Sequence, residues 1–288
     1  MSSSVIISSG DYSATIKAFG AELCSVKHSP TNTEFMWQAG SVWPRHAPVL
    51  FPFVGRLRNF EYQYNGKKYI IEQHGFARDL LFNLVESSEN KAIFELKEDH
   101  YTLQRYPFLF AFRVIYELNG NKLTMGFEMK NTGNSTLPFS FGAHPAFQIS
   151  EPGEVYLQFE SDRNPMSWIL KDNFISTKTR AVTDGKGTLE ITNDTFLDDA
   201  LIFKNLISNW VKLISPKDNI VLKVHLNGWP YLGIWAKPGA SFVCIEPWYG
   251  LADELDFDKE VNKKEGIIML SSQEEFQREF SIEFDFYR

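Results

Sequence analysis

Two ionisable side chains stand before prolines in apolar stretches that lie far apart in the chain. His144 lies in FSFGAHPAF, and Glu246 lies in CIEPWYG. An ionisable group is costly among apolar neighbours unless it has a partner or a task. A near-neutral imidazole exchanges protons around pH 7, and burial beside Trp248 and Tyr249 would raise the pKa of a carboxylate. Each residue alone could also be structural, as a satisfied core histidine or the partner of an arginine. The two types together predict an acid–base pair.

Three further stretches carry polar groups that could hold a ligand. Arg56 lies in GRLRN, and its planar guanidinium can bind two oxygens at once. His74 and Arg78 share the stretch QHGFARD, in which the glycine permits close backbone approach. Asp198 and Asp199 precede an apolar strand pattern and could hold hydroxyl groups. Singly, each stretch is as readily a surface ion pair or a turn.

Motifs for other chemistries are absent. The six histidines show no zinc-type spacing, HExxH does not occur, and Cys24 and Cys244 are too few and too far apart for a metal motif. Neither GxGxxG after a strand nor GxxxxGK[ST] is present, so no nucleotide cofactor is expected. GxSxG is missing too, which removes the usual esterase chemistry. The sequence therefore predicts neither metal nor cofactor.

Composition limits the partners and the compartment. The 288 residues carry a net charge of −7, which argues against nucleic acid as a partner. The N-terminus lacks the pattern of a signal peptide, and the apolar stretch FLFAFRVIY is broken by Arg113 and too short to cross a bilayer. Two cysteines cannot form a disulfide framework. We expect a cytoplasmic protein that binds a small molecule and no membrane.

The elements that must position these residues read as strands. Alternation of period two recurs along the chain, for example over residues 12–18 and 91–97. Asn65-Gly66 predicts a tight hairpin turn, and residues 112–130 repeat the hairpin pattern. Only residues 99–105 suggest a helix, and the C-terminal tail favours a final strand. The pattern predicts an all-β fold: one large antiparallel β-sandwich domain over residues 1–288, with little helix.

In chain order, the five stretches resemble the motifs of the aldose 1-epimerase (galactose mutarotase) family, most closely its LacX-like branch with HGFAR and IEPWYG. The resemblance runs from about Ile16 to the C-terminus. It implies a large single-domain β-sandwich and a cofactor-independent isomerase. Such an enzyme interconverts the α and β anomers of a hexose, such as galactose or glucose, by opening and reclosing the ring.

The resemblance also implies roles for individual residues. His144 takes the place of the general acid and Glu246 that of the general base. Arg56, His74 and Asp198 take the places of substrate-binding residues, with Asp199 as the alternative aspartate. The family's usual Asn-Arg pair is Gly55-Arg56 here, so one hydrogen-bonding group is missing.

Two other functions remain open at this point. A hexose-6-phosphate 1-epimerase would use Arg56, Arg58 and Arg78 as a phosphate pocket; the acidic pI, near 5.5, and the lack of a wider basic patch favour a plain aldose. A non-catalytic sugar-binding or sensing protein could use the same sandwich, but it would need neither His144 nor Glu246. Both a monomer and a homodimer fit the sequence.

Overall fold

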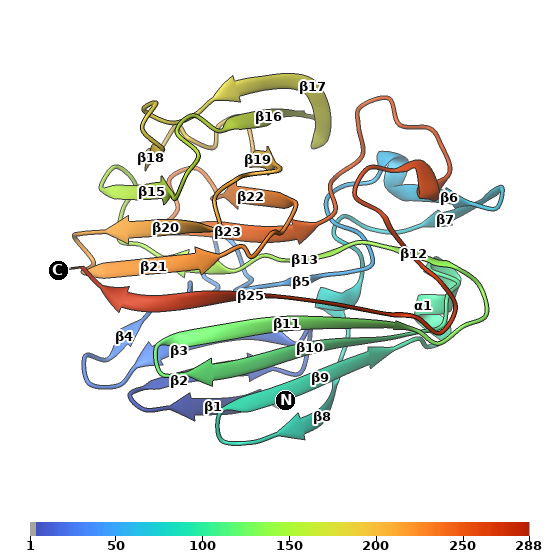
Figure 1. Ribbon diagram of the computed structural model, residues 1–288, viewed down its shortest axis with the longest axis horizontal. Coiled ribbons are helices and arrows are strands. Elements are labelled where there is room, and N and C mark those ends of the chain that lie inside the picture. The colour runs from blue at the N-terminus through green and yellow to red at the C-terminus, as the bar shows by residue number, and fades with distance from the viewer. Residues whose placement is uncertain (1–3, 288) are drawn as a thin grey trace.

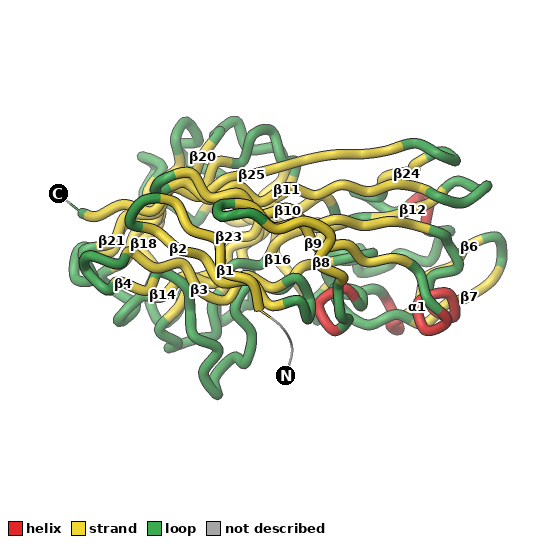
Figure 2. The backbone as a smooth tube through the Cα atoms, turned by 90° about the horizontal axis from the view of Figure 1, so that it is seen from below, coloured by secondary structure: helices red, strands yellow, loops and turns green. Residues whose placement is uncertain are grey.

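Two large antiparallel sheets face each other in the computed structural model, which describes residues 4–287 (Figures 1 and 2). Neither sheet closes into a barrel, and the described chain is mostly strand. The predicted all-β sandwich is confirmed.

The larger sheet has nine strands in the order β18-β15-β20-β21-β25-β11-β10-β9-β8. Short hairpins join β8 to β9, β10 to β11 and β20 to β21, whereas β9 and β10 are connected through α1. The C-terminal strand β25 lies between β21 and β11, so it pairs with strands from two separate parts of the sequence. The bounds are β8 Asn83–Ser87, β9 Lys91–Lys97, β10 Phe110–Asn119, β11 Lys122–Asn131, β15 Val155–Phe159, β18 Thr188–Ile191, β20 Trp210–Ser215, β21 Ile220–His225 and β25 Glu275–Phe286.

The second sheet has eight strands, in the order β17-β16-β19-β22-β23-β13-β5, with β14 also paired to β23. Strand β23 is its central strand and is buried along nearly its whole length. The bounds are β5 Val49–Leu50, β13 Phe141–Ala143, β14 Ala146–Gln148, β16 Met166–Lys171, β17 Phe174–Ala181, β19 Leu201–Lys204, β22 Tyr231–Trp235 and β23 Phe242–Tyr249.

Smaller elements complete the described chain. A four-stranded sheet opens it, two two-stranded sheets lie to one side, and helix is scarce. These elements are β1 Ser4–Ser9, β2 Tyr12–Lys17, β3 Glu22–His28, β4 Thr33–Glu34, β6 Glu61–Tyr64, β7 Lys67–Ile70, β12 Leu137–Phe139, β24 Ile268–Leu270, α1 His100–Arg105, and the 3₁₀ turns η1 Arg58–Phe60, η2 Ala77–Asp79 and η3 Val261–Lys263.

The core between the sheets is rich in aromatic rings. Phe51, just after β5, stacks on Phe112 of β10 with ring centroids 4.5 Å apart. Phe127 of β11 meets Phe141 of β13 at 5.2 Å. Alternation explains this, because every second residue of a strand points to the same face and β10 buries its residues alternately. The phenylalanines are thus mainly core residues.

Local predictions agree with the structure where they rest on strong signals. Asn65 and Gly66 both have positive φ, 49° and 73°, as a tight hairpin turn between β6 and β7 requires. The predicted helix is α1, capped by Asp99, whose side chain accepts a hydrogen bond from the Thr102 amide. The tail is strand β25 throughout. In residues 4–287 no helix combines the length and apolar character needed to cross a bilayer.

Candidate active site

The strand register brings His144 and Glu246 together. On one side Gly142 of β13 pairs with Trp248 of β23, and on the other Ala146 of β14 pairs with Cys244. His144 occupies the break between β13 and β14, directly opposite Glu246. Pro145 cannot donate an amide hydrogen, which explains why the strand is interrupted here.

The two side chains touch at the wall of a cavity of about 310 Å³. Nε2 of His144 lies 3.3 Å from Oε2 of Glu246, and both residues are more than nine-tenths buried. Oε2 makes no hydrogen bond with correct geometry to any residue in 4–287. This volume is that of a small-molecule site, and the free oxygen is available to a ligand hydroxyl.

Burial acts on both groups of the pair and favours their neutral forms. It raises the pKa of Glu246 well above its ordinary value, and the nearby charge of Asp199 raises it further. The same burial lowers the pKa of His144 to about 3, with the positive charges of Arg78 and Arg45 adding to the effect. Burial therefore favours a protonated carboxyl group and a neutral imidazole in this pair.

His74 lies on the same cavity wall and has a defined tautomer. The Gly55 amide donates to Nδ1 of His74 at 3.2 Å, so Nδ1 is an acceptor and the ring proton resides on Nε2. Burial lowers the pKa of His74 well below its ordinary value, and His144 and Arg78 lower it further. His74 is therefore neutral, and its Nε2, which lies 3.3 Å from the side-chain amide of Gln73, is the nitrogen that can donate.

Gly55 fits where an asparagine could not. Its φ is 77°, and a Cβ atom there would lie 2.5 Å from the backbone nitrogen of Ala252. The amide of His74 donates to the Gly55 carbonyl at 2.9 Å, so the two residues exchange hydrogen bonds. The glycine that stands where the family usually has an asparagine therefore lets the backbone of Ala252 approach closely.

Arg56 and Arg78 both line the cavity, whereas Arg58 does not. The guanidinium of Arg56 lies over the ring of Phe60, 4.6 Å from its centroid, and its buried Nε has no partner among the described residues. Arg78 donates from Nη2 to the Gln73 carbonyl at 2.7 Å. Arg58 is exposed and lines a different pocket, so the structure does not bring the three arginines into one site.

The two adjacent aspartates have different surroundings. Asp198 has a side chain 69% exposed and pairs with Arg180 at 2.8 Å, outside the cavity. Asp199 has a φ of 74° and lines the cavity near Glu246. Of the two aspartates, Asp199, with its left-handed backbone, therefore lines the cavity, whereas Asp198, predicted to contact the ligand, does not.

Three tryptophans complete the cavity. Trp43 stacks on the imidazole of His144, with centroids 5.1 Å apart and planes 27° from parallel, and Trp235 approaches it edge-on. Trp248 lies along β23 against Gly142 and Gly233, where a Cβ atom would come within 2.5 Å and 2.6 Å of its ring. Neither Trp43 nor Trp235 was identifiable from the sequence, because no local pattern links them to His144.

The assembled groups can move protons but offer no obvious nucleophile. The pair supplies a proton donor and an acceptor, while Asp199, His74 and Arg56 provide polar contacts and the indoles provide apolar faces. The buried thiol of Cys244 is close, since its Sγ and the ligand atoms of His144 and Glu246 lie within 4.8 Å of one another. Burial raises the pKa of this thiol well above its ordinary value, which keeps it protonated and unreactive.

Comparisons with known proteins place the sequence in a family. Residues 3–280 match the family model described as aldose 1-epimerase. The plasmid-encoded protein LacX of Lactococcus lactis subsp. lactis is 32% identical over 256 residues, which cover 83% of this chain and 85% of LacX.

Solved structures show the same similarity. A galactose mutarotase related enzyme from Lactobacillus acidophilus superposes with a TM-score of 0.93 at 36% identity, covering 98% of this chain and 97% of that one. A galactose mutarotase-like protein from Lactobacillus casei gives a TM-score of 0.92 at 27% identity, covering 98% and 100%. From its sequence and its fold, this chain belongs to the aldose 1-epimerase family.

Proposed function

We propose that this protein is a mutarotase, an isomerase that interconverts the α and β anomers of a hexose such as galactose or glucose. The observation that carries the proposal is the 3.3 Å contact between His144 Nε2 and Glu246 Oε2 on the wall of a sugar-sized cavity. Ring opening requires one proton to leave the anomeric hydroxyl and one to reach the ring oxygen. A paired acid and base, positioned together, meet this requirement.

In the proposed reaction Glu246 is the base and His144 is the acid. The carboxyl proton first crosses the short contact to the imidazole, which leaves a carboxylate and an imidazolium. Glu246 then takes the proton of the anomeric hydroxyl while His144 donates to the ring oxygen, and the C1–O5 bond breaks to give an aldehyde. After rotation about C1–C2, reclosure reverses both transfers. Over the whole cycle each group regains the proton that it gave up, and no electron, metal or cofactor is consumed.

The remaining cavity residues orient the sugar. Nε2 of His74 donates to a sugar oxygen, Asp199 accepts from a hydroxyl, and Arg56 donates to neighbouring oxygens. Trp43 and Trp235 offer apolar faces to the C–H side of the ring. Such orientation lowers the barrier because the reacting atoms are held in place before reaction.

Polarimetry on purified variants tests this proposal. Glu246→Gln and His144→Asn should each lower the mutarotation rate roughly 10²–10⁴-fold, the usual contribution of one positioned proton transfer. Glu89→Gln and His100→Asn are matched controls at exposed positions and should retain the rate. Wild-type mutarotation by both cavity variants would exclude the acid–base assignment. If the wild type bound sugar without any mutarotation, a non-catalytic binding protein would be the better description.

A hexose-6-phosphate 1-epimerase is the second candidate, supported by two arginines, Arg56 and Arg78, at the cavity. Two facts favour the plain aldose: Arg58 lies elsewhere, and Arg78 already donates to a backbone carbonyl. Comparing mutarotation of glucose, galactose and glucose 6-phosphate decides between them. A strong preference for the phosphate that falls in Arg56→Gln and Arg78→Gln would reverse the order.

We infer a cytoplasmic setting for this activity. Both cysteines, Cys24 and Cys244, are free and buried, as suits a reducing compartment. The net charge of −7 disfavours nucleic acid as a partner, and the size of the cavity suits a small sugar.

A further inference from the structure

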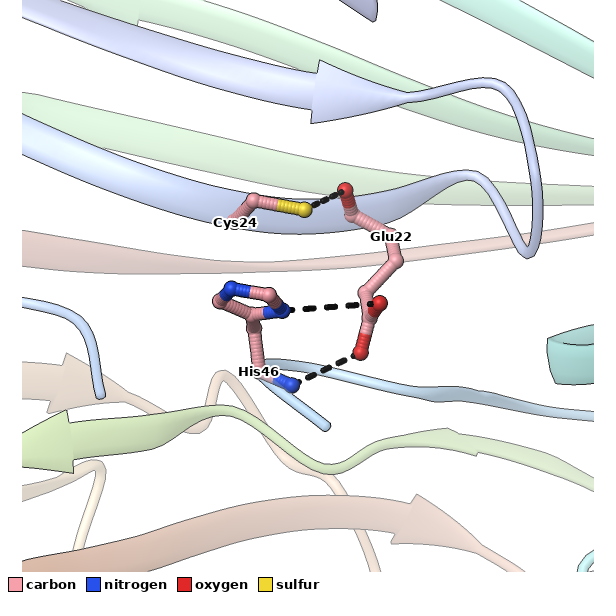
Figure 3. A group of neighbouring side chains, drawn as sticks. All are labelled: Glu22, Cys24 and His46. Carbon is pink, nitrogen blue, oxygen red and sulfur yellow. Dashed lines mark hydrogen bonds and ion pairs between the residues drawn. The ribbon is translucent and has the colours of Figure 1, made fainter. Parts of the chain in front are cut away.

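A second cluster of ligand-type side chains lies outside the cavity (Figure 3). Glu22 and Cys24 come from β3, and His46 comes from the segment that leads into β5. One ligand atom of each residue lies within 4.8 Å of the other two. None of the three lines the cavity described above, so the proposed function leaves this cluster unexplained.

A β-bulge brings Cys24 to the cluster. Between β2 and β3 the register shifts, because Thr15 pairs with Ser25 and the next residue, Ile16, pairs with Leu23. Cys24 is therefore the extra, unpaired residue of β3. A bulge re-aims a side chain and is often found beside functional sites. Here it accompanies a buried thiol that lies beside Glu22, two residues earlier in the same strand.

The carboxylate of Glu22 is fixed at one oxygen and free at the other. Oε1 accepts hydrogen bonds from the amides of His46, at 2.8 Å, and Ala47, at 3.2 Å. Oε2 faces Nδ1 of His46 at 3.7 Å. Nδ1 is buried and makes no hydrogen bond to any residue in 4–287, and His46 as a whole is only 9% exposed. The Glu22 carboxylate is the charged neighbour of Nδ1, but at a distance too long for a hydrogen bond, so both atoms remain able to bind a ligand.

The 3.7 Å separation suits a bridging metal ion better than a direct hydrogen bond. Zinc binds histidine nitrogen and carboxylate oxygen at about 2.0–2.2 Å in tetrahedral geometry, which puts two such ligand atoms roughly 3.3–3.6 Å apart. The thiol of Cys24 now donates to the Glu22 carbonyl at 3.1 Å, within its own strand, and would turn to the metal.

We propose that Glu22 Oε2, Cys24 Sγ and His46 Nδ1 form a binding site for a zinc-class divalent cation, with water as the fourth ligand. Burial raises the pKa of the Cys24 thiol to about 11, so its proton leaves to the solvent only as Zn²⁺ binds, and the Glu22 carboxylate supplies the second negative charge. Two negative ligands then balance the two positive charges, and His46 binds as the neutral imidazole. Thiolate, imidazole and carboxylate are the ligand types that zinc uses in proteins.

The site would join two parts of the fold that flank the catalytic segment. On one side is β3, and on the other is the backbone of residues 46–48. In this second part, the His46 carbonyl accepts a hydrogen bond from the amide of Ala146 at 3.0 Å. The Pro48 carbonyl accepts one from the amide of His144 at 3.1 Å. A cation here is a structural cross-link behind His144, with no part in the proton transfers.

Cobalt(II) titration of the chelator-treated, full-length protein tests the site, because a cobalt–thiolate bond gives a charge-transfer band in the near ultraviolet. We expect one equivalent of Co²⁺ to produce the band and Zn²⁺ to abolish it by displacement. Cys24→Ser should remove the band. His46→Gln should leave a thiolate but weaken Zn²⁺ binding by at least about tenfold, as the loss of a ligand costs no less than the loss of its supporting contact.

Cys244→Ala is the matched control, since Cys244 belongs to the other group of ligand-type atoms, with His144 and Glu246. The band should persist in this variant. Absence of any band in the wild type overturns the proposal, as does a band that survives Cys24→Ser but disappears in Cys244→Ala. If Cys24→Ser does not fold, Zn²⁺ affinity in His46→Gln that equals the wild type overturns it equally. Because binding is the readout, failure here says nothing against the mutarotase activity, and the reverse also holds.

Discussion

His144 lies directly opposite Glu246 in the register of β23, with 3.3 Å between Nε2 and Oε2. A central strand thus delivers the carboxyl group, and a break in its neighbour delivers the imidazole. Burial raises the pKa of Glu246 and lowers that of His144, so the neutral form of each group is favoured. The predictions below follow from this pair and from the residues around it.

The pH profile of catalysis should lack the inflection of an ordinary histidine. His144, with a pKa of about 3, takes up a second proton only in strong acid. The raised pKa of Glu246 moves the loss of its proton above the usual range for a carboxyl group. We expect kcat/KM to stay level between about pH 5 and 8, where an unperturbed histidine, pKa about 6.5, would titrate. Mutarotation corrected for the spontaneous rate measures this, and an inflection near pH 6.5 would contradict it.

Asp199 and Asp198 offer a matched comparison one residue apart. Asp199→Asn should raise KM, because a cavity carboxylate is lost, and should move the basic limb of the pH profile downward, because the repelling charge that raises the pKa of Glu246 is removed. Asp198→Asn loses only an exposed pair with Arg180, so its kinetics should stay near the wild type. Steady-state kinetics of both variants over a pH series provides the test. A larger effect of Asp198→Asn than of Asp199→Asn on the kinetics would indicate that Asp198 binds the sugar.

The turn at Gly55 should tolerate no side chain. Gly55→Ala places a Cβ atom against Ala252 at a φ of 77°, and we expect a loss of about 1–3 kcal/mol in the free energy of unfolding together with a raised KM, since Arg56 and His74 move with it. Gly66→Ala is the control: its φ is 73° but no atom lies within 4 Å of the new Cβ. Denaturant unfolding compares the two. Equal losses would show that backbone strain alone, and not the contact with Ala252, limits the position.

Removing the ionisable group from the pair should stabilise the fold at neutral pH. Because the folded-state pKa of Glu246 is raised, the folded protein keeps a proton that the unfolded chain releases above its ordinary pKa, so stability is lost as pH rises. Glu246→Gln has no such proton. We expect the free energy of unfolding of this variant to exceed that of the wild type by about 0.5–2 kcal/mol near pH 7.5. The difference should vanish near pH 4.

Denaturant unfolding of both proteins at the two pH values measures the effect, with Glu89→Gln, at an exposed position, as the control. A variant that is less stable than the wild type at neutral pH, or a difference independent of pH, would contradict the raised pKa of Glu246.

The sequence was sufficient for features that depend on local pattern. Alternation of period two identified the strands, and Asn65-Gly66 identified a hairpin turn, because these signals depend on residues that are neighbours in the chain. The positions of His144 and Glu246 were predictable for a similar reason: each stands beside a proline in an apolar strand, where an ionisable side chain is out of place. Their contact then follows from the antiparallel register.

Features that depend on folding in three dimensions were beyond the sequence. Whether Asp198 or Asp199 enters the cavity depends on one left-handed φ, and nothing in the Asp-Asp pair reveals it. Trp43 stacks on His144 in a region where residues 46 and 48, close to it in the chain, hydrogen-bond to the catalytic segment. Likewise, no metal-type spacing in the sequence links Glu22, Cys24 and His46. The bulge in β3 and the return of the chain to β3 at residue 46 bring them together.

The placement of Trp248 between Gly142 and Gly233 restricts how this cavity can be re-engineered. Directed evolution toward a new sugar has little room on the strand side, where a single methyl group on either glycine would displace the indole beside Glu246. Asn173, on the turn between β16 and β17, is where library diversity can be introduced without dislodging the catalytic carboxyl group, whereas a change at Asp199 would also act on the pKa of Glu246. Substrate range and reaction chemistry are therefore separable targets in this fold.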